Sequence, residues 1–247
     1  TGICLSECMA TLLILGSKPD PELPPDSSWD DLACANASGF SAAKLGLPEP
    51  KFTVVTAILT SGIGSGRQSM AAMRGLHTGT LYFLRSTSRK ASLRQSSPMK
   101  FVRALPKALR VTPAYFRWAM SRAGYQWDHF VDAQVDHYVE FAKNWCPADA
   151  DLFVQAASKR PSTGLTALLI GMSLQRYDRF ILSGFSFELT HAYADNPEIG
   201  ERGTRESGHA PTDIRFLQCL SSSPGNLFTT EATVNQMAGV PLLGQGG

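Results

Sequence analysis

Long hydrophobic runs are missing from this sequence, and so is any dense set of cysteines. No run of about 18 apolar residues occurs, so no segment is expected to span a bilayer as a helix. The five cysteines are Cys4, Cys8, Cys34, Cys146 and Cys219. They are odd in number and scattered, which predicts reduced thiols in a cytoplasmic protein rather than a disulfide framework. Cys4 and Cys8 have no second pair to complete a zinc site.

Acidic residues are absent from a long central region. No Asp or Glu lies between Glu49 and Asp128, a stretch that holds 13 of the 23 Lys and Arg residues. This asymmetry indicates an anionic partner (a phosphorylated donor, an acidic glycan or a membrane surface), and a solvated basic face explains it equally well. A membrane partner would make the protein peripheral to the inner membrane through the basic region 67–122. Nucleic acid is a poorer candidate, because no known nucleic-acid-binding pattern accompanies the charge.

The remaining composition is that of an ordinary globular protein, with 43% hydrophobic and 18% charged residues. A chain of 247 residues can bury a substantial core, so we expect one domain over 1–247. Because the chain opens at Thr1 rather than at methionine, we expect it to be an excised part of a longer protein. A signal or anchor segment upstream is compatible with these residues.

Apolar runs that end at glycine or asparagine alternate with helical patterns along the chain. The predicted strands are 11–15, 32–35, 52–59, 80–84 and 179–184. The predicted helices are 99–110, 113–123, 128–143 and one that begins within 161–164. This alternation predicts an α/β fold with a mainly parallel sheet. Ligands of such sheets lie beyond the carboxyl ends of the strands, where Gly16, Asn36 and Gly184 fall.

Candidate metal ligands occur in two places. His129, Asp132, Asp136 and Glu140 would share one face of the predicted helix 128–143, where a solvated polar face is the more ordinary explanation. The only Asp-x-Asp pattern is Asp149-Ala150-Asp151, which reads better as negative charge at a helix N-terminus. We therefore expect no metal.

Three segments follow one another in the second half of the chain. They are Arg160-Pro161-Ser162-Thr163-Gly164, then Ile181–Phe187 after a helix, then Gly208–Ile214. Their order and spacing resemble the bacterial CMP-sialic acid-dependent sialyltransferases, which are metal-independent and GT-A-like. Residues 161–164 also resemble the S motif of animal sialyltransferases. Residues 15–19 and 34–36 are similar to the nucleotide-binding loop and the strand-end asparagine of the bacterial family.

The resemblance implies a single Rossmann-like, GT-A-like domain without a cofactor. It also implies inverting transfer of sialic acid from CMP-sialic acid to a hydroxyl of a glycan or lipid-linked glycan. The residues implied in donor binding are Gly16, Ser17, Asn36, Thr56, Arg160, Ser162, Thr163, Gly164, Gly184 and Phe185. CMP-Kdo is an alternative donor, because it carries the same anomeric carboxylate. A non-catalytic nucleotide- or glycan-binding module is an alternative function. A serine hydrolase is disfavoured, since the sequence has no G-x-S-x-G elbow.

The chemistry of the residues themselves is compatible with an acidic donor. Ser162, Thr163 and Gly164 would present hydroxyl and N–H groups at a helix N-terminus, a place suited to a carboxylate or phosphate. Arg160 could form a bidentate pair with the same anion. Ordinary helix capping beside a surface arginine is the simpler alternative.

His209 is the candidate general base, because an imidazole titrates near neutrality and can take a proton from an acceptor hydroxyl. Asp213 would orient His209 if the segment is helical, or else serve as a helix N-terminal charge. Residues 188–207 are polar and aperiodic, which suits a lid over the substrate. The resemblance implies that Tyr193 hydrogen-bonds the leaving phosphate. A second family tyrosine falls at Glu188, which is not a neutral donor.

Overall fold

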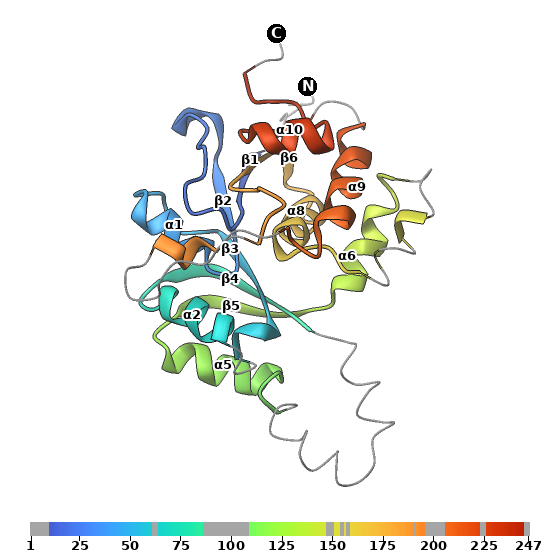
Figure 1. Ribbon diagram of the computed structural model, residues 1–247. Coiled ribbons are helices and arrows are strands. Elements are labelled where there is room, and N and C mark those ends of the chain that lie inside the picture. Colours follow the sequence, from blue (N-terminus) through green and yellow to red (C-terminus); the bar gives the residue numbers. More distant parts are fainter. Residues whose placement is uncertain are drawn as a thin grey trace, which may run out of the picture.

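The computed structural model describes residues 10–60, 64–85, 109–146, 151–153, 156, 159–189, 191–195, 206–222 and 226–244. These residues form a seven-stranded sheet in which all neighbouring strands are parallel, in the order β5-β4-β3-β2-β1-β6-β7 (Figure 1). The strands are β1 (Ala10–Leu15), β2 (Asp31–Ala35), β3 (Phe52–Thr56), β4 (His77–Leu84), β5 (Gln126–Ala133), β6 (Tyr177–Ser183) and β7 (Leu227–Thr229). The predicted α/β class with a mainly parallel sheet is confirmed.

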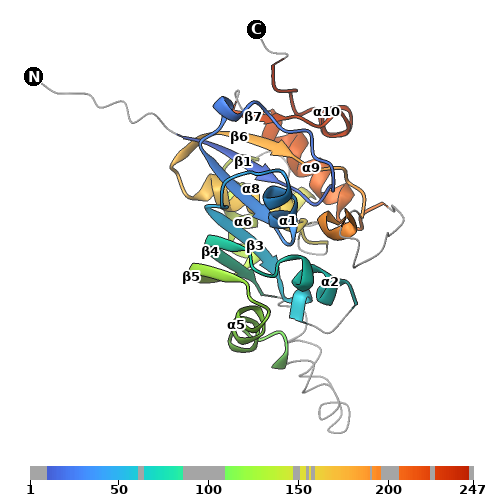
Figure 2. The same cartoon turned by 90° about the vertical axis from the view of Figure 1, so that its left-hand side faces the viewer.

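Helices cover both faces of this sheet (Figures 1 and 2). One face is packed by α6 (Val135–Ala142), α8 (Thr163–Ser173), α9 (Ala210–Ser221) and α10 (Ala232–Ala238). The other is packed by α1 (Ser38–Lys44), α2 (Gly64–Ala72) and α5 (Pro113–Arg122). Short 3₁₀ helices occur at η1 (Asp26–Ser28), η2 (Ala57–Thr60) and η3 (Ala192–Asp195). No helix in the described part of the chain is long and apolar enough to cross a membrane.

The central strand β1 shows why the sheet is buried on both faces. Leu12 and Ile14 point into the core beneath α8, whereas Leu13 and Leu15 point into the core beneath α1. A strand covered on both sides gains nothing from alternating polarity, so its sequence is a continuous apolar run. This run is the reason that the strand could be predicted.

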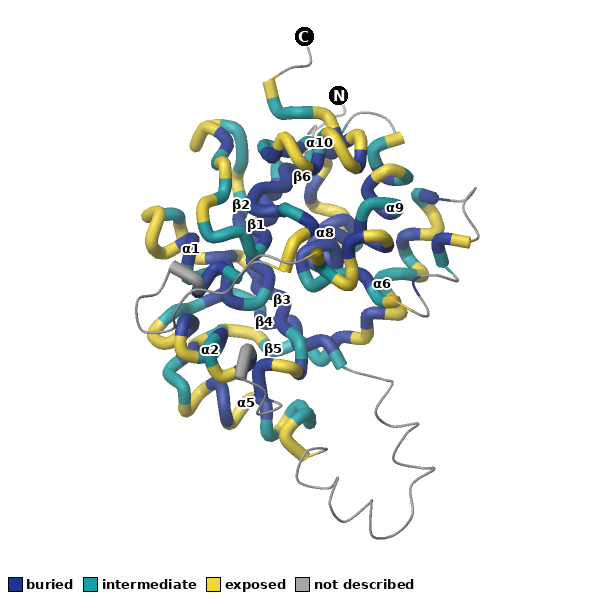
Figure 3. The backbone as a smooth tube through the Cα atoms, viewed as in Figure 1, coloured by how far each residue is buried: buried dark blue, intermediate teal, exposed yellow. Residues whose placement is uncertain are grey.

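Helix α8 is buried along almost its whole length (Figure 3). It begins where the sequence predicts, because the Ser162 side chain caps it by accepting a hydrogen bond from Leu165 N at 3.1 Å. Gly171 lets the helix lie close to the sheet, since a Cβ there would come within 2.5 Å of the Leu12 side chain. A capped helix that is buried almost throughout and packs on the central strands fixes the position of its own N-terminus.

Other predicted elements match the structure to different degrees. The strands at 11–15, 32–35, 80–84 and 179–184 and the helix at 113–123 are confirmed within a few residues. The strand at 52–59 ends at Thr56, and η2 follows it. Of the predicted helix 99–110, only the last two residues lie within the described part of the chain.

The predicted helix 128–143 is wrong in its first half. Residues 126–133 form the edge strand β5, which pairs with β4, and α6 begins only at Val135. Phe130 and Val131 pack into cores on opposite faces of the sheet, as neighbouring residues of a strand do. Because β5 is a half-exposed edge strand, it carries polar residues on both faces. The alternation of polar and apolar residues that identifies a strand is therefore weak in its sequence. The shared helical face proposed for His129, Asp132, Asp136 and Glu140 therefore does not exist.

The expectation of reduced thiols is also wrong for one pair. Cys146, after α6, and Cys219, on α9, form a disulfide with their Cα atoms 5.7 Å apart. The packing of α6 and α9 on the same face brings together residues that are 73 positions apart, which their spacing in sequence does not reveal. Cys34 is a free thiol whose pKa burial raises to about 12. Cys4 and Cys8 lie outside the described residues.

Candidate active site

A cavity of about 320 Å³ opens at the carboxyl ends of β1, β2, β3 and β6, where a parallel sheet ordinarily binds its ligand. Most residues predicted for donor binding or catalysis line it. They are Gly16, Ser17, Asn36, Thr56, Ser162, Thr163, Gly164, Gly184, Phe185, Tyr193, His209 and Asp213. The fold thus brings together residues from distant segments, and their individual roles stay predictions.

One side of the cavity, here called the glycine wall, consists of Gly16, Ser17, Gly184 and Phe185. Gly16 N donates a hydrogen bond to Ser183 O at 2.8 Å, which holds the ends of β1 and β6 together. A Cβ on Gly16 would lie 2.3 Å from Gly184 O, and Gly184 itself has φ +71°. Only glycine fits such a close approach and such a backbone conformation.

A buried carboxylate that the sequence did not reveal fixes this wall. Glu231 is 2% exposed and accepts hydrogen bonds from Gly184 N at 2.8 Å and Glu22 N at 3.0 Å. It also accepts one from Lys18 Nζ at 2.6 Å. Three donors satisfy the buried charge, and together they bind the loop after β1 to the end of β6. Nothing in the local sequence connects Glu231 with residues more than 200 positions earlier.

Asn36 stands at the end of β2 in the left-handed conformation, with φ 51°. Its backbone N donates to Val54 O at 2.8 Å, which fixes the turn into α1. Its side-chain Oδ1 is buried and has no hydrogen-bond partner among the described residues. Buried polar atoms are nearly always paired in folded proteins, so a lone acceptor beside a cavity marks a place for a ligand donor.

A second part of the cavity lining, here called the helix wall, consists of Ser162, Thr163, His209 and Asp213. It joins the N-terminus of α8 to the first turn of α9. Asp213 Oδ1 accepts a hydrogen bond from Ser162 N at 2.9 Å, and Thr212 Oγ1 donates one to Lys159 O at 3.1 Å. The start of α9 thus holds the turn that precedes α8.

Asp213 is 6% exposed, and burial raises its pKa to about 6. Hydrogen bonds from Ser162 and the charge of His209 oppose this rise without cancelling it. The sequence predicted that Asp213 orients His209, but the Asp213 carboxylate accepts its hydrogen bond from Ser162 N. Asp213 therefore holds the backbone of the turn by a hydrogen bond. Its interaction with His209 is electrostatic.

His209 is oriented by a backbone carbonyl. Its Nδ1 lies 2.7 Å from Arg160 O, and a carbonyl oxygen can only accept, so Nδ1 carries the proton in the neutral ring. Nε2 is then the acceptor, which is the state that a general base requires. The imidazole is exposed at the cavity, where a bound hydroxyl can reach it.

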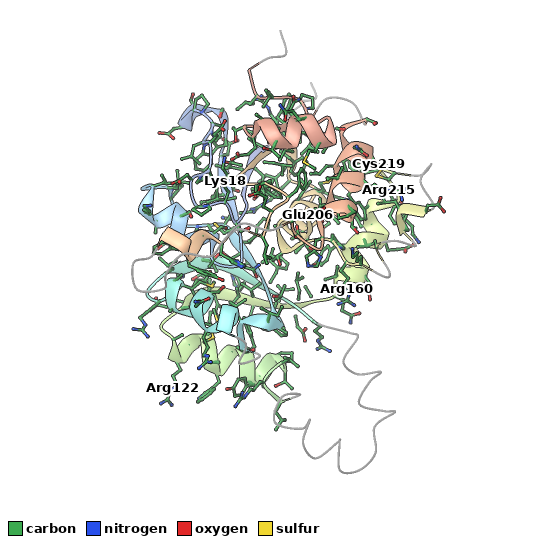
Figure 4. The ribbon with its side chains drawn as sticks, in the orientation of Figure 1. Lys18, Arg122, Arg160, Glu206, Arg215 and Cys219 are labelled. Carbon is green, nitrogen blue, oxygen red and sulfur yellow. A yellow bond between two sulfur atoms is a disulfide. The ribbon has the colours of Figure 1, made fainter. Side chains whose placement is uncertain are left out.

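Arg160 is not among the residues that line the cavity, contrary to its predicted role. Its guanidinium donates to Arg85 O at 3.2 Å and lies 3.5 Å from Asp136 of α6. Figure 4 shows Arg160 beside α6. The Arg160 carbonyl faces His209, whereas the guanidinium faces Asp136 and Arg85 O. A sequence motif does not specify which of these groups faces the cavity. Arg85 in turn forms a bidentate ion pair with Asp132.

The predicted lid 188–207 is described at 188–189, 191–195 and 206–207. Glu188 and Glu206 form an antiparallel bridge, and η3 packs its Tyr193 into the core that α2 and α5 share. The ring of His191 stacks on Tyr193, with centroids 4.7 Å apart and 9° between the planes. Glu188 also lines the cavity, at the position where the resemblance would place a tyrosine. Opening and closing of this segment stays a prediction.

Comparison with known proteins finds no matching family model and no matching curated protein. Solved structures do match. The sialyltransferase CstII from Campylobacter jejuni in complex with CMP-3FNeuAc is 15% identical, with a TM-score of 0.53 over 95% of this chain and 86% of that one. The monofunctional α-2,3-sialyltransferase Cst-I from Campylobacter jejuni is 14% identical, with a TM-score of 0.50 over 98% and 83%. At such identities the likeness shows a shared fold.

Proposed function

We propose that this chain is an inverting glycosyltransferase that moves sialic acid from CMP-sialic acid to a glycan hydroxyl. The observation that carries the proposal is His209, whose Nδ1 is held by Arg160 O beside the N-terminus of α8. A fold shared with CMP-bound sialyltransferases supports it, since those proteins hold CMP or CMP-3FNeuAc. One of them is described with a trisaccharide acceptor, which supports a glycan as the second substrate.

In the proposed reaction the donor lies between the two walls. The glycine wall lets the nucleotide approach the strand ends closely, and the free N–H groups at the start of α8 favour the donor's negative charge. Asn36 Oδ1 accepts a hydrogen bond from an amino or hydroxyl group of the donor.

The chemical step needs one base and a stabilised leaving group. The acceptor hydroxyl attacks the anomeric carbon from the face opposite CMP, and its proton passes to His209 Nε2 as the new C–O bond forms. The old C–O bond breaks with both electrons going to the phosphate oxygen of CMP. Tyr193 is proposed to donate a hydrogen bond to that phosphate. Asp213 is a positioning residue, because it holds the turn whose Arg160 carbonyl orients His209.

The donor's identity and the acceptor are finer proposals. CMP-Kdo presents the same anomeric carboxylate, so the helix wall does not distinguish it from CMP-sialic acid. Glu188 at the cavity favours the alternative of a non-catalytic binding module, because a carboxylate repels a leaving phosphate. A lipid-linked acceptor and a cytoplasmic location stay predictions. The Cys146–Cys219 disulfide favours an oxidising compartment instead.

A donor panel tests the proposal. Purified protein is incubated with CMP-sialic acid, CMP-Kdo, UDP-sugars and GDP-sugars, with and without a mixture of oligosaccharide acceptors, and free nucleotide is measured. We expect CMP release from CMP-sialic acid that rises with acceptor and is lost in His209→Ala. Equal turnover of a UDP- or GDP-sugar would contradict the donor assignment. Binding of CMP without any release would favour the non-catalytic module.

A further inference from the structure

Helix α5 has one packed side and one bare side. Phe116 and Met120 are buried against the sheet, and the Phe116 ring lies 4.4 Å from that of Phe83. The bare side follows helical spacing, at Ala114, Arg117, Trp118, Ser121 and Arg122. We call these five residues the α5 face. Figures 1 and 2 place it at the end of the molecule opposite α10, and Figure 4 shows Arg122 directed outward.

The charged residues of the α5 face, Arg117 and Arg122, are both positive. Among the described residues neither Arg117 nor Arg122 forms an ion pair, and their guanidinium groups lie over the rings of Phe130 and Trp118 instead. The reason is in the sequence, since no carboxylate occurs between Glu49 and Asp128. An anion that approaches this face meets two guanidinium groups that form no ion pair with a carboxylate of the described residues.

Large apolar side chains are exposed on the α5 face and in the turn before it. Trp118 is 55% exposed and Leu109, in the turn before the helix, is 54% exposed; these are the highest values for large hydrophobic residues in the described part of the chain. Trp118 and Trp127 line a shallow depression together with Arg117 and Arg122. Arginine and tryptophan together on an exposed helix are typical of segments that lie in a membrane interface.

We propose that the α5 face docks on a lipid surface that carries anionic headgroups. Arg117 and Arg122 attract the headgroups, and Trp118 enters the interface between headgroup and acyl chain. A soluble polyanion would explain the arginines but would leave the exposed Trp118 and Leu109 without a role. The proposal does not rest on transferase activity, because it concerns a surface away from the cavity.

Docking through α5 would hold the cavity near the lipid. Thr60, the last residue of η2, donates from Oγ1 to Arg110 O at 2.6 Å, which ties η2 to the turn before α5. Ile58 and Leu59 of η2 line the cavity. The helix on the lipid is therefore only one 3₁₀ turn away from the cavity wall.

Vesicle co-sedimentation tests the docking. The protein is mixed with vesicles of phosphatidylcholine alone, or with a substantial share of phosphatidylglycerol, at low and at high salt. We expect binding only to the anionic vesicles, weakened by salt. Arg117→Gln with Arg122→Gln should lower the partition coefficient by about fivefold for each charge removed. Matched controls on other surfaces, Lys143→Gln at the C-cap of α6 and Met237→Ala on α10, should bind as wild type does.

A second readout separates lipid from other anions. Brominated lipid should quench tryptophan fluorescence on binding. Trp118→Phe should lose most of that quenching while keeping the native melting temperature, and the remainder should come from Trp127 in the same depression. The absence of anionic-vesicle binding would overturn the proposal. So would binding that the controls weaken as much as the α5 variants do. Binding to heparin or DNA that depends on the arginines but not on Trp118, without quenching by lipid, would assign the face to a soluble polyanion instead.

Discussion

The glycine wall and the helix wall both line the cavity but are built from different atoms. The glycine wall is mostly main chain, and the buried Glu231 fixes it with three donors. The helix wall presents titratable side chains, of which His209 is exposed and Asp213 is buried with a raised pKa. One wall is therefore a fixed scaffold for a ligand, and the other holds groups that can exchange protons.

Because of this difference, substitutions in the two walls should affect different properties, the stability of the fold in one case and the catalytic rate in the other. A change in the glycine wall should destabilise the protein and weaken ligand binding, because it frees a loop that forms the cavity. A change at His209 should reduce turnover and leave the fold intact, because the ring is exposed and makes a single hydrogen bond to the described residues. Variants on the two walls should thus give opposite patterns in melting and kinetic measurements.

The largest expected effect is on turnover in His209→Ala. Loss of a positioned general base should lower kcat by roughly 10²–10⁴-fold, while the melting temperature stays close to that of wild type. Steady-state kinetics with CMP-sialic acid and differential scanning fluorimetry measure the two quantities. His77→Ala is the matched control, since His77 lies at the other end of β4 and pairs with Glu49 and Asp128. Near-native kcat in a folded His209→Ala protein would end the general-base assignment.

Glu231→Gln should be the most destabilising of these changes. The substitution replaces the carboxylate with a neutral amide, so the ion pair with Lys18 Nζ, now 2.6 Å away, is lost. Because Lys18 is partly exposed and can regain water, we expect a loss of about 2–3 kcal/mol in the free energy of unfolding. Urea titration measures it. Glu22→Gln is the control, because Glu22 is exposed and lies 4.0 Å from the same lysine. Equal stability of the two variants would show that Glu231 does not hold the wall.

Asp213→Asn should remove a pH dependence of stability. Burial raises the pKa of Asp213 to about 6, so the folded protein binds its proton more tightly than the unfolded chain does. The resulting stability is present at low pH and is lost between about pH 4 and pH 6, by about 2–3 kcal/mol. Unfolding of wild type and variant across this range measures the difference, with the exposed Asp178→Asn as control. Parallel curves for wild type and Asp213→Asn would contradict the raised pKa.

Arg160→Gln should have the smallest effect on the donor. Its guanidinium pairs with Asp136 and Arg85 O outside the cavity, and its carbonyl, which orients His209, is unchanged by the substitution. We expect the KM for the donor to change by less than about twofold, because the partly exposed ion pair between Arg160 and Asp136 contributes little free energy and lies outside the cavity. A large rise in the donor KM would restore the bidentate role that the motif suggested.

The sequence was informative where local physics decides the structure. The apolar run of β1, the Ser162 cap of α8 and the glycines at the strand ends all depend on near neighbours. Order along the chain then placed these strand ends on one edge of the sheet, which brought Gly16, Asn36 and Gly184 to one cavity. That much follows from the rules of parallel sheets.

Long-range packing supplied what the sequence could not. The helix predicted over 128–143 was half wrong because an exposed edge strand carries a weak alternation. Glu231, the Cys146–Cys219 disulfide and the outward course of the Arg160 side chain each depend on a partner far away in the chain. Motifs identified which residues meet, but not which atoms of those residues face the cavity.

The most direct test of the central claim is nucleotide binding to the cavity. Melting of the protein is followed with CMP, UDP and GDP, each over a range of concentrations. Binding to the folded state alone should stabilise it by about 2.7 kcal/mol at a hundredfold excess over Kd. We predict a rise in melting temperature with CMP that UDP and GDP do not produce, and its loss in Gly16→Val. Equal rises with UDP or GDP, or no rise with CMP, would contradict the account.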